Sequence, residues 1–71
     1  MGNRAEVAKL IHDLRNPINS IAMTAELAKL QVASGESADA IVENLETIVR
    51  LCRDCGVRLE VFAREGEESS R

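Results

Sequence analysis

Apolar residues recur along most of the chain in alternating steps of three and four positions. This spacing is the heptad pattern of helices that pack against other helices in coiled coils and bundles. It predicts two long helices, the first over about 4–34 and the second over about 37–64. The apolar heptad positions are Val7, Ile11, Leu14, Ile18, Ile21, Ala25, Ala28 and Val32 in the first helix, and Ile41, Leu45, Ile48, Cys52, Cys55, Leu59 and Phe62 in the second.

The break between the two helices lies at Gly35 and Ser37. Glycine suits the position just after a helix end, and serine suits the cap of the next helix, with Asp39 in its first turn. So short a loop makes the helices antiparallel neighbours. Residues 1–64 therefore form the predicted domain, and the charged residues 65–71 are expected to be a flexible tail.

The heptad positions also predict the assembly. A lone hairpin covers only one side of each apolar stripe, whereas two hairpins cover both sides. The expected fold class is all-α, an antiparallel two-helix hairpin that dimerises into a four-helix bundle. A chain of 71 residues fits this expectation, because one small core seldom supplies more than ~3–5 kcal/mol without a partner or a staple.

Composition narrows the class of protein further. One Phe and no Trp or Tyr argue against a β-sandwich or barrel. A net charge of −3 argues against a nucleic-acid partner. Two cysteines and one histidine cannot build a four-ligand zinc site, so no metal is expected. No apolar run approaches ~18 residues, and no basic start leads into a signal segment, so a cytoplasmic protein without a membrane segment is expected.

A second stripe lies on the first helix, roughly opposite the heptad positions. It begins polar and becomes apolar towards the loop, and it consists of His12, Asn16, Asn19, Met23, Leu27 and Leu30. One interpretation is a bundle wider than two helices per chain, or single exposed apolar residues that are simply tolerated. The other is a docking surface beneath the histidine.

The residues around His12 carry the candidate chemistry. An exposed imidazole can act as a nucleophile towards phosphorus, and the neighbouring Asp13 carboxylate can hold its second nitrogen or accept a proton. The Asn16 amide, one turn away, is able to position a water molecule. Pro17 removes a helix hydrogen bond to the Asp13 carbonyl. Because the heptad pattern continues in register, Pro17 is expected to kink one helix, the alternative being that it begins a new one.

The run His12-Asp13-Leu14-Arg15-Asn16-Pro17 resembles the H-box of sensor histidine kinases, and the hairpin around it is similar to their dimerisation and histidine-phosphotransfer domain. The resemblance implies that His12 is the phosphoacceptor, with Asp13 as the assisting acid or base. It implies that Asn16 positions water, that Arg15 gives electrostatic support and that Pro17 bends the helix for signalling. It also implies a docking surface for a response-regulator receiver domain, formed by Asn19, Ser20, Met23, Leu27 and Leu30.

The chain departs from that family in having no Gly-rich phosphate-binding loop. ATP and Mg would therefore act only through a separate ATP-binding kinase domain, and autonomous kinase activity is not expected. The chain is either an excised domain or a stand-alone phosphotransfer protein. The alternative function is a non-catalytic dimerisation module that binds or sequesters a kinase or response regulator. A plain coiled coil with an accidental H-box is the third interpretation.

The second helix has two further features. Cys52 and Cys55 have the spacing of a redox pair, but on the heptad positions they fit small apolar core residues, the alternative being contact between equivalent cysteines across the dimer axis. If the chain turns near Gly35, Arg58 lies level with His12 and is a candidate cation for a phosphoryl group; otherwise it belongs to a solvated charged face.

Overall fold

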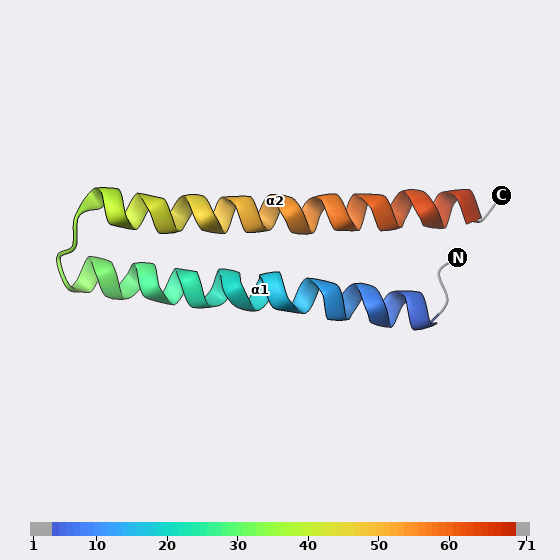
Figure 1. The fold of residues 1–71 in the computed structure, drawn as a ribbon, viewed down its shortest axis with the longest axis horizontal. Coiled ribbons are helices and arrows are strands. Elements are labelled where there is room, and N and C mark those ends of the chain that lie inside the picture. The colour runs from blue at the N-terminus through green and yellow to red at the C-terminus, as the bar shows by residue number, and fades with distance from the viewer. Residues whose placement is uncertain (1–3, 70–71) are drawn as a thin grey trace.

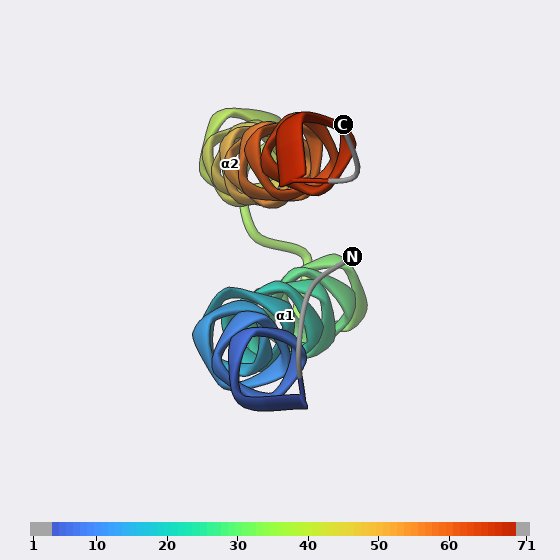
Figure 2. The same ribbon diagram turned by 90° about the vertical axis from the view of Figure 1, so that its right-hand side faces the viewer.

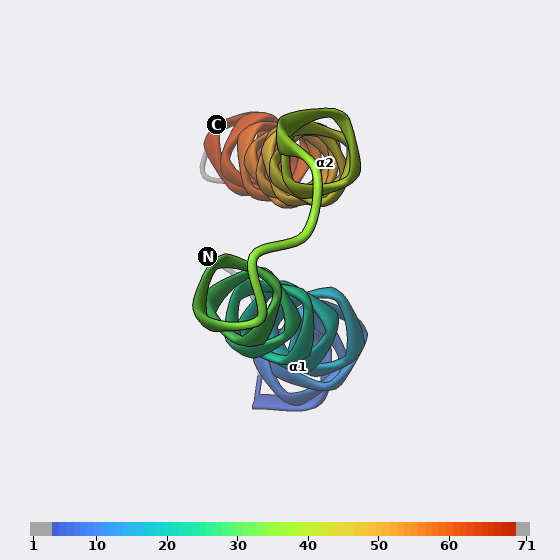
Figure 3. The same ribbon diagram turned by 90° about the vertical axis from the view of Figure 1, so that its left-hand side faces the viewer.

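The structure is a computed structural model that describes the backbone of residues 4–69 and the side chains of residues 4–66. Helix α1 spans Arg4–Ala33 and helix α2 spans Ala38–Ser69 (Figure 1). The helices run antiparallel, and the end views show α1 and α2 lying side by side (Figures 2 and 3). The predicted all-α antiparallel hairpin is confirmed.

The shape of the chain is elongated, with extents of 55 × 17 × 10 Å and a radius of gyration of 16.4 Å. A globular chain of this length would have a radius of gyration of about 11 Å. Within the described residues, no helix is both long and apolar enough to cross a membrane.

The loop between the helices is fixed by two caps. The N–H of Gly35 donates to the carbonyl of Val32 at 3.2 Å, and the N–H of Glu36 donates to the carbonyl of Gln31 at 3.0 Å. These two bonds form a Schellman motif, and Gly35 supplies its left-handed residue with a φ of 72°. The Ser37 hydroxyl accepts the N–H of Ala40 at 3.3 Å and so caps α2. The predicted roles of Gly35 and Ser37 are confirmed.

The far end of α2 differs from the expectation. The helix does not stop at residue 64 but continues to Ser69, so residues 65–69, expected to be part of a flexible tail, are helical. No proline follows, and Glu favours helix, so Gly66 alone, at about 1 kcal/mol, does not end it. An ion pair of 2.6 Å between Arg64 and Glu60 supports the turn before it. Residues 70 and 71 lie outside the described residues.

Pro17 lies inside α1, which runs through it without interruption. The alternative in which Pro17 begins a separate helix is therefore wrong. Its ring leaves the carbonyl of Asp13 without the N–H that a helix would normally supply. Figure 1 shows α1 diverging from α2 towards its N-terminal end.

The predicted heptad positions divide into two sets. The inward set, half-buried or buried between the helices, is Leu14, Ile21, Ala25, Ala28, Ile41, Ile48, Cys55 and Phe62. The outward set is exposed and consists of Val7, Ile11, Ile18, Val32, Leu45, Cys52 and Leu59. Each set repeats mainly at seven-residue intervals, as expected when a helix meets two neighbours at once.

The contact between the helices is thin and includes a polar bond between described side chains. Among the described side chains only Ala28 and Gln31 are buried, at 7% and 9% exposure. The Asn44 amide donates to the side-chain oxygen of Gln31 at 2.6 Å, which satisfies the buried amide. Large apolar side chains such as Ile11 and Ile18 stay 62% and 52% exposed, so a single hairpin leaves much of its apolar surface in water.

Candidate functional site

His12 and Asp13 form a close pair in the N-terminal half of α1. The His12 side chain is 81% exposed and the Asp13 side chain 38% exposed, with Nδ1 and Oδ1 3.8 Å apart. This separation is within ion-pair range but beyond a hydrogen bond. With the carboxylate on the Nδ1 side of the ring, the Nε2 atom is left open to solvent. An Nδ1–H donated to Asp13 would leave the Nε2 lone pair free to act as a nucleophile.

The next turn of α1 continues this exposed face. Arg15 and Asn16 are both exposed, and Asn16 lies one helical turn after His12, on the same side of α1. Pro17 is half-buried and faces α2. His12, Arg15 and Asn16 are thus exposed together next to Asp13, whereas Leu14 and Pro17 are half-buried. The individual chemical roles assigned to these residues from sequence stay predictions.

The second stripe is uncovered over its whole length. Asn19 and Ser20 are exposed, and Met23, Leu27 and Leu30 are 74%, 48% and 64% exposed. The last three line a shallow apolar depression of about 370 Å³ together with Ala22 and Glu26. Within one hairpin, α2 does not cover this surface, so packing inside the chain does not explain its apolar residues.

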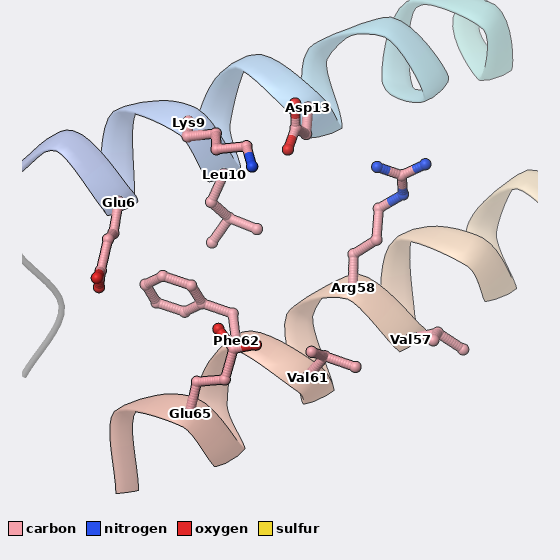
Figure 4. A pocket seen from close by; sticks show the side chains of 9 residues that line it. All are labelled: Glu6, Lys9, Leu10, Asp13, Val57, Arg58, Val61, Phe62 and Glu65. Carbon is pink, nitrogen blue, oxygen red and sulfur yellow. The ribbon is translucent and has the colours of Figure 1, made fainter. Parts of the chain in front are cut away.

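A groove between α1 and α2, here named the α1/α2 groove, lies next to the H-box and was not anticipated from the sequence. It has a volume of about 420 Å³. It combines four apolar side chains with five charged ones, and its lining consists of Glu6, Lys9, Leu10, Asp13, Val57, Arg58, Val61, Phe62 and Glu65 (Figure 4). One indication of this groove is present in the sequence, because the predicted hairpin places Arg58 level with the H-box. The groove itself could not be predicted, since it depends on how α1 and α2 diverge.

Arg58 points from α2 across this groove towards α1, and Asp13 lies on the facing wall (Figure 4). Among the described residues Arg58 has no hydrogen bond or ion-pair partner within 4 Å, whereas Arg64 on the same helix is paired with Glu60. His12 does not line the groove. Asp13 therefore borders both the groove and the histidine.

The two cysteines occupy different surroundings, although both are free. Cys55 belongs to the inward set and is half-buried, as its predicted core role requires. Cys52 is exposed and belongs to the outward set, so it is not a core residue within one hairpin, and its place in the core of a dimer stays a prediction. The reason is geometric, because a step of three residues carries Cys52 round the helix, away from α1.

The fold and the site together define a helical hairpin that presents an exposed histidine–carboxylate pair just before a proline within the helix. The profile of the His Kinase A (phospho-acceptor) domain family matches residues 3–55, which include the whole of α1 and the H-box. The chain belongs to the His Kinase A (phospho-acceptor) domain family, and this membership supports a phosphoacceptor and dimerisation role in two-component histidine kinase signalling. No curated protein and no solved structure gives a significant match.

Proposed function

We propose that His12 carries a phosphoryl group and exchanges it with an aspartate of a response-regulator receiver domain. The observation that carries this proposal is that a phospho-acceptor domain with a single histidine holds that histidine 81% exposed beside a carboxylate. An accessible nucleophile paired with a potential base is the arrangement that covalent catalysis requires.

In the proposed transfer, the Nε2 lone pair of His12 attacks the phosphorus atom and the bond to the donor oxygen breaks. Asp13 holds or accepts the Nδ1 proton, which keeps the imidazole nucleophilic. In the second step, a carboxylate oxygen of the receiver attacks phosphorus and the N–P bond breaks. Arg15 gives electrostatic support to the phosphoryl oxygens, and Asn16 positions a water molecule for hydrolysis of the receiver's acyl phosphate.

The phosphate donor in this proposal lies outside the hairpin. A separate ATP-binding kinase domain supplies ATP and Mg and phosphorylates His12. The receiver domain docks below His12, on part of the second stripe and the adjacent Ser20, with contacts at Asn19, Ser20, Met23, Leu27 and Leu30. The exposure of the last three side chains supports this docking surface. In this proposal the pathway operates in the cytoplasm.

The proposed active form is a homodimeric four-helix bundle. The outward set supports it, because seven heptad positions of an otherwise regular pattern remain exposed in one hairpin. Pairing two outward sets would bury apolar side chains from four helices in one core. A bend at Pro17 would let the parts of that bundle on either side of this residue change their packing separately.

Back-transfer from receiver domains tests the proposal. A panel of phosphorylated receivers is mixed with the chain, and acid-labile phosphate on the chain is measured with His12→Gln as the control. Labelling of the wild type alone is expected, and equal labelling of His12→Gln would refute the assignment. Replacement of Asn16 by Ala is expected to slow dephosphorylation of the receiver while leaving labelling intact.

The non-catalytic alternative predicts a different outcome of the same assay. A receiver or kinase would then bind the chain equally well after His12→Ala, and no receiver would leave phosphohistidine on the wild type. The exposed apolar residues of the second stripe suit either function, so binding and labelling are measured on the same samples.

A further inference from the structure

We infer that Arg58 is a positioning residue that holds the Asp13 carboxylate against His12, so that side chains from both helices act together at the phosphorylation site. This inference rests on the proposed function of His12. It goes beyond the H-box, because Arg58 comes from α2 and lies outside residues 3–55, the part of the chain that the family profile covers.

The geometry supports a row of three side chains, His12, Asp13 and Arg58, with Asp13 in the middle. On one side, Asp13 Oδ1 lies 3.8 Å from His12 Nδ1. On the other, Asp13 lines the α1/α2 groove into which Arg58 extends from the opposite wall (Figure 4). A carboxylate has two oxygens and about four acceptor sites, so it can serve both donors at once.

Arg58 is available for this contact. It has no partner among the described residues, and a guanidinium beside a carboxylate gains from charge-assisted hydrogen bonds. Asp13 Oδ1, in turn, lies 3.8 Å from His12 Nδ1, beyond hydrogen-bond distance, so the carboxylate has to move closer to the ring to complete that contact. A third group that fixes the carboxylate is how other nucleophile–base pairs keep their alignment.

Lys9 is the other cation in the groove and is the rival for this role. It stands one turn before Asp13 on the same helix, and its ammonium is a flexible point charge, whereas a guanidinium donates in a planar fork. Arg58 also belongs to the other helix. Through it, the position of Asp13 would depend on how α1 and α2 pack at this level, which Lys9 cannot provide.

The first test reads the tautomer of His12 by nitrogen NMR, at about pH 9 where a histidine is neutral. The wild type is expected to show mainly the Nδ1–H tautomer. Arg58→Gln is expected to lower this fraction towards that of Asp13→Asn, and Arg58→Lys, which keeps the charge but not the planar fork, to retain only part of it. An unchanged fraction in Arg58→Gln, or a larger change in Lys9→Gln, overturns the inference.

The second test measures the rate of phosphohistidine formation from phosphoramidate. His12 Nε2 forms the new N–P bond, the P–N bond of the donor breaks and ammonia leaves, while the Nδ1 proton passes to Asp13. Arg58→Gln is expected to slow the reaction about tenfold, as misalignment of a reacting group does. The double variant with Asp13→Asn is expected to be no slower than Asp13→Asn alone.

The matched control is Arg53→Gln, which removes the same charge from an exposed position of α2 outside the groove. It is expected to change neither readout, and an equal effect of Arg53→Gln and Arg58→Gln overturns the inference. Labelling that depends on His12 but not on Arg58 refutes the role of Arg58 alone. Labelling that survives His12→Gln refutes the proposed function, and the tautomer measurement, which needs no donor, still decides the role of Arg58.

Discussion

Replacing Ile18 by Ala tests which exposed face of the hairpin meets a second copy of the chain. Ile18 belongs to the outward set and is 52% exposed, whereas Leu27 belongs to the second stripe and is 48% exposed. Both lie on α1, so Leu27→Ala is a control of nearly equal exposure on a different face. If the outward sets form the dimer core, only the Ile18 substitution weakens association.

The expected magnitude follows from the area still exposed. Full burial of such a side chain contributes about 1.5–3 kcal/mol. Because roughly half of Ile18 is already covered in the hairpin, dimerisation would add about 1 kcal/mol per copy. A symmetric dimer loses this twice, so Ile18→Ala is expected to cost about 2 kcal/mol, or a Kd weaker by about thirtyfold.

Sedimentation equilibrium over a range of protein concentrations measures both dissociation constants directly. Leu27→Ala is expected to stay within about threefold of the wild type, a difference well below the value calculated for Ile18. Equal weakening by the two substitutions, or an unchanged Kd for Ile18→Ala, would refute the argument that the outward set forms the dimer interface.

Four further variants are compared by urea unfolding at one fixed protein concentration, since stability depends on concentration when chains associate. Asn44→Ala leaves the buried Gln31 amide unpaired and is expected to cost about 1–3 kcal/mol, whereas Gln31→Leu with Asn44→Leu should recover most of it. Gly35→Ala is expected to cost about 1 kcal/mol from its positive φ alone, because the added Cβ meets open space. Pro17→Ala restores the missing N–H and is expected to raise the free energy of unfolding by up to about 3 kcal/mol. A lower free energy of unfolding would contradict the cost assigned to a proline inside α1.

The hairpin could be predicted from sequence because its signals are local. Gly35 and Ser37 act within a few residues of their own positions, through a left-handed φ and a side-chain cap. The heptad spacing gives the helical period directly. The end of α2 could be predicted less precisely, since the glutamates after Phe62 suit both a solvated helix and a flexible tail.

The contacts between the helices were harder to predict because they depend on rotation and divergence of α1 and α2. Periodicity alone did not distinguish Cys55, which faces α1, from Cys52, which is exposed. Gln31 is polar, so its burial could not be predicted from its residue type. The hydrogen bond from Asn44 explains it. Similarly, the H-box identified Asp13, but only the groove showed that Arg58 faces it.

The most direct test of the central claim is to locate the phosphoryl group after labelling of the wild-type chain. Tandem mass spectrometry identifies the modified residue, and phosphorus–nitrogen NMR identifies the bonded atom. We expect one phosphoryl group, on Nε2 of His12, stable in base and lost in acid. Phosphate on a serine or on Asp13, or no phosphate from donors that label other phosphotransfer domains, would contradict the account.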